Sequence, residues 1–302
     1  VYEKSLASGW FIPVTSDNPD PYELIASNQA DAVLIPAAGG FSRGLERKDA
    51  KLQLLINATN VNKAQAIDSY LQSIVQSVVQ QDLKLKPPVM PIKIESRVLF
   101  NPDLETSIFM VPGTMCMLML ISTMVLANIA VVREKEMGTF EMLISAPVTR
   151  SEIIYGKTIP YVILGMSNFP LILSVAVFVF KVPLRGHLLV LLLAALVFVC
   201  TAVALGSLIS TFCKNQQQAT LAGFLFIFPM VMLSGLMFPV ENMPMAIKCL
   251  SFMDPLYHYI GLLRNIMLKG GGSEYVTHHI AVLALMAVVT VSISLRRFHT
   301  TL

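Results

Sequence analysis

Five long apolar segments after residue 106 constrain the fold more than any other feature of the sequence. They cover residues 107–132, 158–180, 188–213, 219–240 and 275–295. About 20 residues of helix, at roughly 1.5 Å per residue, cross a hydrocarbon core of about 30 Å. Each segment is long enough to span a membrane. The sequence therefore predicts a polytopic α-helical membrane protein with five spans in this chain.

Composition agrees with a membrane protein and excludes several other classes. Charged residues make up 14% of the chain and apolar ones 55%, whereas an average soluble domain has about 25% charged residues. Ten of the 22 Lys and Arg lie in residues 1–106, which indicates a polar region followed by a membrane region. The net charge of +3 is small and scattered, so we expect a lipid membrane and no nucleic acid as a partner.

The cysteines point to no metal centre and no disulfide framework. All four (Cys116, Cys200, Cys213 and Cys249) lie in apolar or membrane-flanking sequence, and no pair has the spacing of metal ligands. We interpret them as buried single thiols.

Residues 1–103 are predicted to form an extracytoplasmic α+β domain. Apolar positions recur with helical spacing across "VNKAQAIDSYLQSIVQSVVQQDL", and residues 51–57 and 91–100 alternate as half-buried strands do. A shorter strand–helix–strand pattern covers "FIPVT", "DPYELIASNQ" and "DAVLIP". Together they predict two related β-α-β units. The region has no catalytic triad or metal cluster, which favours a folded spacer or docking module over an enzyme.

Orientation follows from the loops. If the end of the chain is cytoplasmic, the cytoplasmic loops hold more Lys and Arg than the short outer loops, as membrane proteins generally do. An odd number of spans then places residues 1–103 outside the cytoplasm. The sequence begins at Val1 without a signal-like apolar stretch, and we expect an N-terminal membrane span to be missing.

A compact charged block lies between the first two spans. Residues 133–157 contain four basic and four acidic side chains. A helix over 133–146 would gather its apolar side chains on one side, and Pro147 would end it. "TRSE", residues 149–152, is a capping box that starts a new helix leading into the next span. The block is predicted to be a short charged elbow, with a solvated loop as the alternative.

Four motifs resemble the membrane subunits of ATP-binding-cassette exporters of the type-2 (ABC-2) permease family with a large outer domain. They are "FNPDLETSIFMVPG", "REKEMGTFEMLISAPVTRSEIIYGK", "SGLMFPVENMP" and "PLYHYIGLLRNIML". The resemblance covers nearly the whole chain. It implies that residues 133–146 are a cytoplasmic coupling helix that binds a cleft of an ATPase subunit. The implied contact residues are Glu134, Lys135, Glu136, Gly138, Thr139, Glu141 and Leu143, with Arg150 and Glu152 at the far edge.

Two short helices are predicted within residues 242–270. Asn242 precedes Pro244 and Asp254 precedes Pro255, and each pair reads as the start of a helix. The second helix should end at a glycine. Both are too short to span alone, so we expect a re-entrant or interfacial position on the outer side, and the family places such helices at the outer mouth of the pathway. His258 and Arg264 are interpreted as interfacial anchors rather than substrate ligands.

The sequence lacks the means to use ATP by itself. No G-x-x-x-x-G-K-[ST] phosphate loop is present, and "AAGGFSRG" has neither its spacing nor its lysine. The middle of the spans also holds no Asp, Glu, Lys or Arg to act as a proton or ion relay. Energy must come from a partner, so we expect no cofactor in this chain, with ATP and Mg bound by the ATPase. Polar residues within the spans could line the path or bond between helices: Asn128, Ser167, Asn168 and Ser174.

The sequence thus predicts a transport subunit rather than an enzyme, with its transmembrane domain in residues 104–302. A separate ATPase would supply the energy for the export of drugs, lipids or polysaccharides. The expected partners are the ATPase, a second permease copy or homologue, and a periplasmic adaptor. The expected location is the cytoplasmic (inner) membrane of a bacterium. The alternative is a membrane receptor or scaffold with an extracytoplasmic sensory domain.

Overall fold

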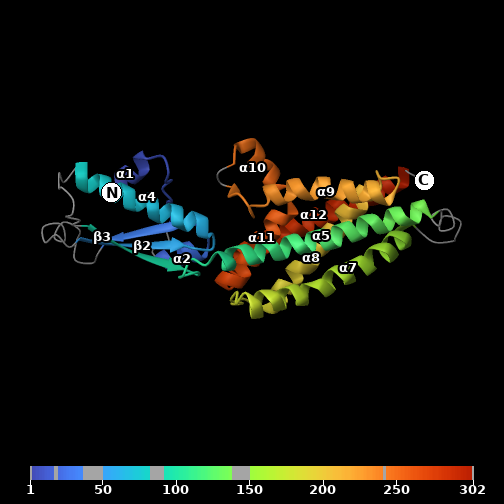
Figure 1. Ribbon diagram of the computed structural model, residues 1–302, viewed down its shortest axis with the longest axis horizontal. Helices are drawn as coiled ribbons and strands as arrows, with labels where there is room; N and C mark the ends of the chain where they lie inside the picture. Colours follow the sequence, from blue (N-terminus) through green and yellow to red (C-terminus); the bar gives the residue numbers. More distant parts are fainter. Residues whose placement is uncertain are drawn as a thin grey trace. The chain divides into compact units, whose positions relative to one another are not determined.

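The chain divides into two compact units, Val1–Phe109 and Met110–Leu302. The computed structural model describes residues 2–16, 20–36, 50–81, 92–137, 150–240 and 243–300. Figure 1 shows an α+β arrangement in the first unit and long helices in the second. Each unit is described by itself below.

The first unit is built around a three-stranded sheet in the order β1-β2-β3. β2 (Ala50–Asn57) and β3 (Ile92–Leu99) are parallel, with Ala50 opposite Ile92, and β1 (Ala32–Pro36) runs antiparallel to β2. The helix α4 (Val61–Gln81) connects the two parallel strands. This is one β-α-β unit with an added antiparallel strand.

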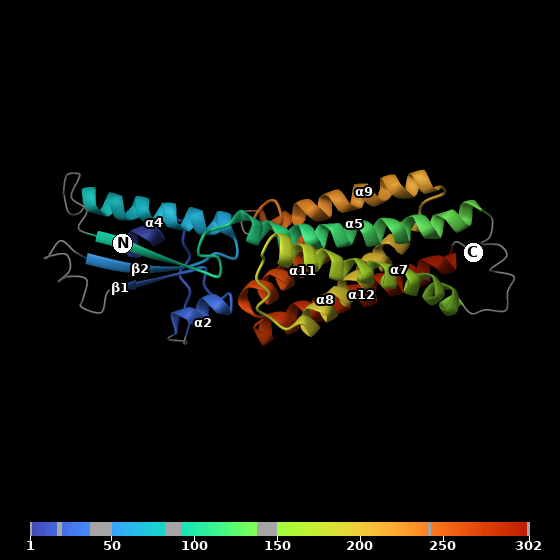
Figure 2. The ribbon, with the colours of Figure 1, turned by 60° about the horizontal axis from the view of Figure 1, so that its bottom comes forward.

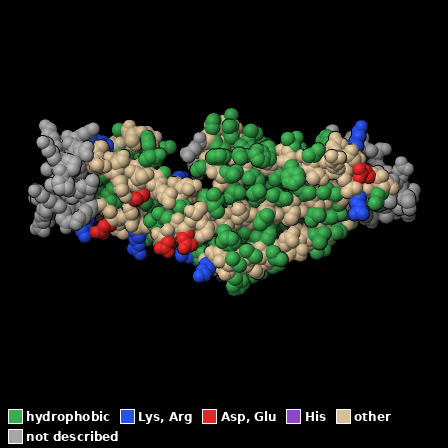
Figure 3. Space-filling model, in the orientation of Figure 1, with side chains coloured by type: hydrophobic (Ala, Val, Ile, Leu, Met, Phe, Trp, Pro, Cys, Tyr) green, Lys and Arg blue, Asp and Glu red, His purple; other side chains and the backbone are tan. Residues whose placement is uncertain are grey.

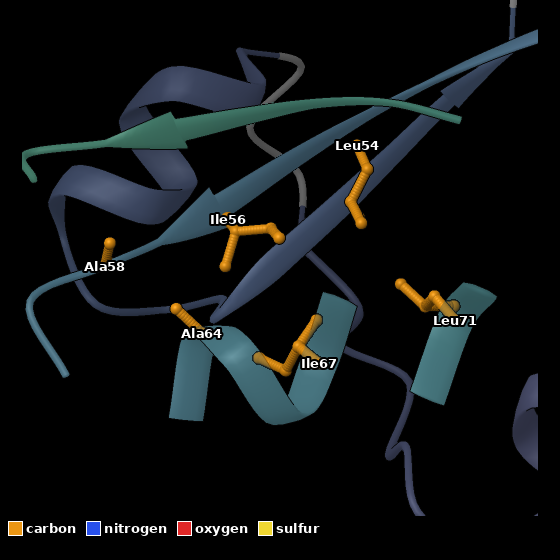
Figure 4. Packing of buried hydrophobic residues seen from close by; sticks show 6 residues of the cluster. All are labelled: Leu54, Ile56, Ala58, Ala64, Ile67 and Leu71. Carbon is orange, nitrogen blue, oxygen red and sulfur yellow. The ribbon is translucent and has the colours of Figure 1, made fainter. Parts of the chain in front are cut away.

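The apolar face of α4 covers the sheet, as its sequence period predicts. Ala64, Ile67 and Leu71 from α4 pack with Leu54, Ile56 and Ala58 from β2 and the turn that follows it (Figure 4). The strand alternation of β2 places Leu54 and Ile56 on the same face. The helix and strands predicted over residues 51–100 are therefore present, with β3 described from Ile92 to Leu99.

The prediction of a second β-α-β unit is wrong. Residues 11–16, "FIPVTS", form no regular strand, and the segment before them is a short helix, α1 (Tyr2–Ala7). Pro13 lacks the N–H that a strand ladder needs, which explains why residues 11–15 did not form a strand. The short helix α2 (Pro21–Ala26) is present, and Asp20 caps it by accepting a hydrogen bond from Tyr22 N at 2.8 Å.

Among its described residues, the second unit contains five helices that are long and apolar enough to cross a membrane. They are α5 (Thr106–Glu136), α7 (Arg150–Ser174, extended by the π-helical turn η1, Val175–Val179), α8 (Leu188–Ser210), α9 (Gln216–Leu233) and α12 (Ser273–Thr300). The polytopic helical fold predicted from the apolar segments is confirmed. Three of these helices contain proline: Pro112 in α5, Pro160 and Pro170 in α7, and Pro229 in α9.

α8 lies at the centre of this helical unit. It packs against α7, α9, α11 and α12, and its residues from Leu191 to Ser210 are mostly buried. Figures 1 and 2 both show it enclosed by the other helices. By contrast, α7, α9 and α12 expose many large apolar side chains, such as Leu171, Phe228 and Leu285. An apolar surface of this kind is suited to lipid or to another membrane helix.

Two short helices complete the unit. α10 (Met245–Phe252) and α11 (Pro255–Arg264) are joined at Asp254, and a π-helical turn, η3 (Asn265–Lys269), extends α11. As the sequence predicts, Asp254 caps α11, with its Oδ1 accepting from Leu256 N at 2.9 Å. Also as predicted, a glycine ends the segment: Gly270 has φ 91°, a left-handed conformation that favours glycine.

The span boundaries differ from the expectation at several points: α9 ends at Leu233 rather than at residue 240, and the charged block begins differently. Residues 133–136 were expected to begin a separate helix, but they continue α5 to Glu136, and Met137 forms a turn. The cause is local, because Arg133–Glu136 are all good helix formers and the first residue that disfavours a helix is Gly138. The rest of the predicted coupling helix, 138–146, lies outside the described residues.

Candidate coupling site and polar contacts between the spans

The carboxylate of Glu136 joins the end of α5 to the start of α9. One oxygen accepts a hydrogen bond from Gln216 N at 3.2 Å, and the other accepts from the Gln216 side-chain Nε2 at 2.6 Å. Gln216 is the first residue of α9, so its N–H is one of those that a helix leaves without an internal partner. A negative charge there is also favourable for the helix dipole.

The N-terminus of α9 has a second cap from its own sequence. The Asn215 side chain accepts from Gln218 N at 2.7 Å, and Gln218 Oε1 accepts from Lys214 N at 2.9 Å. The signal was available, since an asparagine directly before an apolar helix is a preferred N-cap. The contact between Gln216 and Glu136 could not be predicted from the sequence, because the two residues are far apart in it. We call this end of the helical unit, where α5 ends and α9 begins, the block end.

Asn128 forms a second contact between α5 and α9. It is fully buried, and its Nδ2 donates to the carbonyl oxygen of Ala219 at 2.6 Å. Its Oδ1 has no hydrogen-bond partner among the described residues. A Cβ at Gly223 would lie 3.3 Å from Asn128 Nδ2, so the glycine leaves room for the amide. Figure 2 shows the two helices running side by side.

Small residues let the backbones of α5, α7 and α8 approach closely. A Cβ at Gly206 on α8 would lie 2.5 Å from the Met124 carbonyl oxygen of α5. A Cβ at Gly165 on α7 would lie 2.8 Å from both Thr123 Oγ1 and Val199 Cγ1. Helices in lipid associate largely through such close packing, because lipid tails are as apolar as the side chains.

The four polar residues predicted for the transport path fall into two groups. Asn128 bonds to α9 as described, and Asn168 on α7 donates to Ser122 Oγ on α5 at 3.4 Å. Ser167 and Ser174 are exposed and bond to carbonyl groups of their own helix, Leu164 O at 2.7 Å and Pro170 O at 2.6 Å. Asn128 and Asn168 thus bond between helices in this structure, and a role for any of the four in the transport path stays a prediction.

Most of the predicted coupling residues lie outside what the structure describes. Gly138, Thr139, Glu141 and Leu143 are not described, and Glu134, Lys135, Arg150 and Glu152 are placed in helices without a description of their side chains. Their contact with an ATPase stays a prediction. Glu136 is the member of the set whose side chain is described, and its partner is Gln216.

The opposite end of the helical unit holds α11 and a histidine pair. His258 Nδ1 lies 2.9 Å from His279 Nδ1 on α12, and His258 Nε2 lies 2.9 Å from the Phe252 carbonyl oxygen. Because a carbonyl only accepts, the His258 Nε2 carries a proton, and its Nδ1 accepts from His279. His258 was interpreted as an interfacial anchor, but it is buried and joins α10, α11 and α12.

Burial controls the ionisation of two groups on this segment. It raises the pKa of the Asp254 carboxyl from 3.8 to about 8, against the lowering effect of hydrogen bonds from the Leu256 and Tyr257 backbone. It lowers the pKa of His258, which the hydrogen bond to Phe252 partly opposes. Both groups are therefore held in their neutral forms near pH 7.

Other residues of α11 contact the spans directly. Tyr259 is fully buried and stacks on Phe198 of α8, with ring centroids 4.1 Å apart and an angle of 13° between the rings. Arg264 was predicted to be an interfacial anchor, and it lies against α5, where a Cβ at Gly113 would be 3.3 Å from its Nη2. The helix thus lies against the spans rather than away from them.

A connection between two spans is also tied to this end. Arg185 N, between α7 and α8, donates to Met267 O of η3 at 3.0 Å. A Cβ at Gly186 would lie 2.6 Å from the Ile266 carbonyl oxygen. The connection therefore passes close to the η3 backbone, at the end of the unit opposite the block end.

Comparison with known proteins decides the family. Residues 7–296 match the model of the family described as ABC-2 family transporter protein. The chain belongs to the ABC-2 transporter family. This confirms the resemblance of the four motifs, and it makes the chain an ABC transporter permease, a transport component.

Several relatives have permease names. The chain is 30% identical over 282 residues to "Probable multidrug ABC transporter permease YbhR" of Escherichia coli (strain K12), covering 93% of this chain and 77% of the relative. It is 33% identical over 265 residues to "Probable multidrug ABC transporter permease YbhS" of the same strain, covering 84% and 69%. It is 29% identical over 303 residues to "Inner membrane transport permease YhhJ", covering 97% and 79%.

These relatives and the apolar helices place this ABC-2 permease in the bacterial inner membrane. On the face shown in Figure 3, apolar side chains cover the middle of the helical unit, and charged side chains gather at its right-hand end. Permeases of this family work with an ATPase subunit. The predicted location, the family and the multi-pass topology are thus confirmed.

Proposed function

We propose that the chain is the permease subunit of an ATP-driven exporter that moves amphipathic, drug-like compounds out of the cytoplasm. A separate ATPase subunit binds the charged block and supplies the energy, with ATP and Mg bound by that subunit. The names of two relatives, which include "multidrug", favour this substrate class over lipids and polysaccharides.

The observation that carries the proposal is the position of the charged block. The block, residues 133–157, overlaps the last turn of α5 and the first turns of α7, so both helices reach it at one end of the helical unit. At that end Glu136 already bonds to α9. A partner that moves the block therefore acts on three spans at once. Within the spans, no Asp, Glu, Lys or Arg lies near the middle to support ion coupling.

The proposed orientation places the block end in the cytoplasm and the first unit outside it. The first unit leads through Glu105 into the opposite end of α5 from the block. Outside the cytoplasm, its surface can bind a periplasmic adaptor. A second copy of this permease or a homologue completes the transport path, and the exposed apolar faces of α7, α9 and α12 give such a partner a surface to pack against.

Transport in this proposal needs no covalent chemistry in the permease. Closure of two ATPase subunits tilts α5, α7 and α9 through their shared end, and α8 acts as the central support. The opposite end, where α11 lies against α5 and α8, then changes its access to the outside. Substrate leaves there because its site opens outward while the block end closes.

The experiment is transport with and without the ATPase. Inverted membrane vesicles that contain the permease and the ATPase encoded beside it should accumulate Hoechst 33342 when ATP and Mg are added. Vesicles with either subunit alone, or with a hydrolysis-deficient ATPase, should not. The purified permease alone should show no ATP hydrolysis.

Two results would contradict the proposal. Co-purification of a kinase or regulator instead of an ATPase would support the receptor alternative. Dye movement that a protonophore abolishes while ATP has no effect would show ion-driven transport.

A further inference from the structure

We propose that Glu136 is a positioning residue that fixes the start of α9 to the end of α5, so that a displacement of α5 at the block end is passed to α9. Family resemblance placed Glu136 among the residues that contact the ATPase. The inference assigns its carboxylate to the permease itself. It rests on the proposed function for its role in transport, but the contact can be tested without transport.

The first step is the geometry of the carboxylate. Both oxygens are used, one by the Gln216 main-chain N–H at 3.2 Å and the other by the Gln216 side chain at 2.6 Å. Charge-assisted hydrogen bonds of this kind are stronger than neutral ones. The contact also adds a carboxylate to the positive end of α9, which no acidic residue of the first turn of α9 supplies.

The second step is that the contact does not stand alone. Asn128, two turns before Glu136 on α5, donates to Ala219 O, one turn after Gln216 on α9. A single contact would leave α9 free to pivot about it. Two contacts separated along both helices oppose pivoting, so the block-end halves of α5 and α9 move as a pair.

The third step concerns what lies around the contact. Gln216 is half-buried, Glu136 is exposed, and the neighbouring Arg133 and Lys214 are exposed charged residues. An exposed contact adds little stability by itself. It can still set the relative position of two helix ends, because the Asn128 contact and the Asn215 cap already hold the rest of the geometry.

The pair Glu136 and Gln216 allows a test by exchange. Glu136→Ala removes both acceptors, and Gln216→Glu places two carboxylates together. The double variant Glu136→Gln/Gln216→Glu exchanges amide and carboxylate and can form the side-chain bond in reverse. Gln217→Glu is the matched control, since it adds the same charge one residue along at an exposed position that contacts no α5 residue in the hydrogen bonds described.

The first measurement is hydrogen–deuterium exchange of the permease alone, in lipid nanodiscs. In Glu136→Ala and Gln216→Glu, exchange in the first turn of α9 should be about twofold to fivefold faster, the size expected for the loss of an exposed contact to a charged group. The double variant should restore slow exchange, and Gln217→Glu should match the wild type.

The second measurement is made on the complex with the ATPase, in vesicles. Both single variants should retain the ATPase on co-purification but lose about twofold to thirtyfold in ATP-dependent Hoechst 33342 accumulation, the range expected for a coupling contact. The exchanged pair should recover. If the contact only stabilised the fold, the single variants would not keep normal ATPase binding while they lose transport. The exchanged pair would then also have no reason to recover coupling.

Three outcomes would overturn the inference. Unchanged exchange in Glu136→Ala would show that the contact is absent. Release of the ATPase by Glu136→Ala, with Gln216→Glu harmless, would make Glu136 a direct ATPase contact. Altered exchange with normal transport in both single variants would show that the contact does not position α9 for coupling. A wild-type complex that moves no dye contradicts the proposed function instead, and the exchange data still decide whether the contact exists.

Discussion

Single glycines decide how closely the spans approach one another. Gly206 lies so near the Met124 carbonyl that even a methyl group would meet backbone rather than a side chain that can turn away. In lipid this close fit replaces the hydrophobic effect that holds helices together in water. A small residue in the middle of an apolar segment is therefore a structural requirement here.

Gly206→Ala should destabilise the protein by about 1–3 kcal/mol, because overpacking forces α5 and α8 apart. The matched control is Gly156→Ala in α7, where a Cβ meets nothing within 4 Å. That change should be neutral or stabilise by up to about 1 kcal/mol through helix propensity. A thiol-reactive dye can follow unfolding in detergent, since Cys116 and Cys213 are buried and the changes Cys200→Ser and Cys249→Ser remove the partly buried and the exposed thiol. Equal midpoints for the two variants would contradict the close packing.

The buried carboxyl of Asp254 gives a pH-dependent stability. Its pKa is raised in the folded state, from 3.8 to about 8. Its contribution is therefore fully present below pH 3.8 and is lost as the pH rises toward 8, because the unfolded chain releases a proton that the folded chain keeps.

Asp254→Asn should remove this dependence while keeping the cap, because an asparagine oxygen can accept from Leu256 N. We expect the thermal midpoint of the wild type to fall more steeply than that of the variant between pH 5 and pH 8. Thermal unfolding followed by circular dichroism, at fixed detergent and salt, measures both, because the rate of a thiol-reactive dye would itself change with pH. Parallel pH profiles would show that Asp254 is not held neutral in the folded protein.

At this scale the sequence predicted residue types better than residue roles. It singled out Asn128 and Asn168 but could not say whether they face a path or a neighbouring helix, because the hydrophobic pattern of a span does not mark which side faces protein. It did not find Gln216 or His279 as partners. Their contacts depend on which helices are neighbours, and local spacing carries no such information.

Among the elements, the helix–strand contacts of the first unit follow most directly from the sequence. The period of α4 predicts one apolar face with Ile67, Tyr70, Leu71, Ile74, Val75 and Val78, of which Ile67, Leu71 and Val75 are buried and Tyr70 is 39% exposed. The "FIPVT" segment failed as a strand because Pro13 removes a backbone donor, a signal that the strand prediction did not weigh. The antiparallel pairing of β1 was also beyond the sequence, since pairing direction depends on how the connection closes.

The first unit should fold alone in reducing buffer, because it contains no cysteine and has its own core. Residues 1–103 should give a mixed helix and strand circular dichroism spectrum with cooperative urea unfolding. Leu54→Ala, at a fully buried position, should cost about 2–5 kcal/mol. Ile12→Ala, at a position 88% exposed, should change stability by less than about 0.5 kcal/mol. A random-coil spectrum in reducing buffer would contradict this prediction.

For the whole molecule, the main feature is the set of five described helices that are long and apolar enough to cross a membrane. The apolar segments predicted this arrangement almost completely, because a bilayer imposes a length and a polarity that the sequence must satisfy. The lengths of individual helices were less predictable. α5 runs past the apolar region to Glu136, since charged helix formers can extend a span into water.

Thiol labelling can test the proposed orientation. In a Cys249→Ser background, Ser69→Cys on α4 should react with a membrane-impermeant maleimide in intact cells, and Lys214→Cys should react only after lysis. Both positions are exposed, so accessibility within the protein does not limit either reaction. The reverse pattern would invert the orientation, and labelling of both sites in intact cells would contradict an odd number of crossings.

The bond from Arg185 to Met267 has a consequence for biosynthesis. A ribosome completes α7, the turn that follows it and α8 well before it reaches η3. The Arg185 N–H therefore cannot bond to the Met267 carbonyl oxygen until η3 has been synthesised. The two spans can enter the bilayer in the meantime, but the loop between them reaches its final shape only late in translation. The connection between α7 and α8 therefore reaches its final structure only after the C-terminal third of the chain has been synthesised.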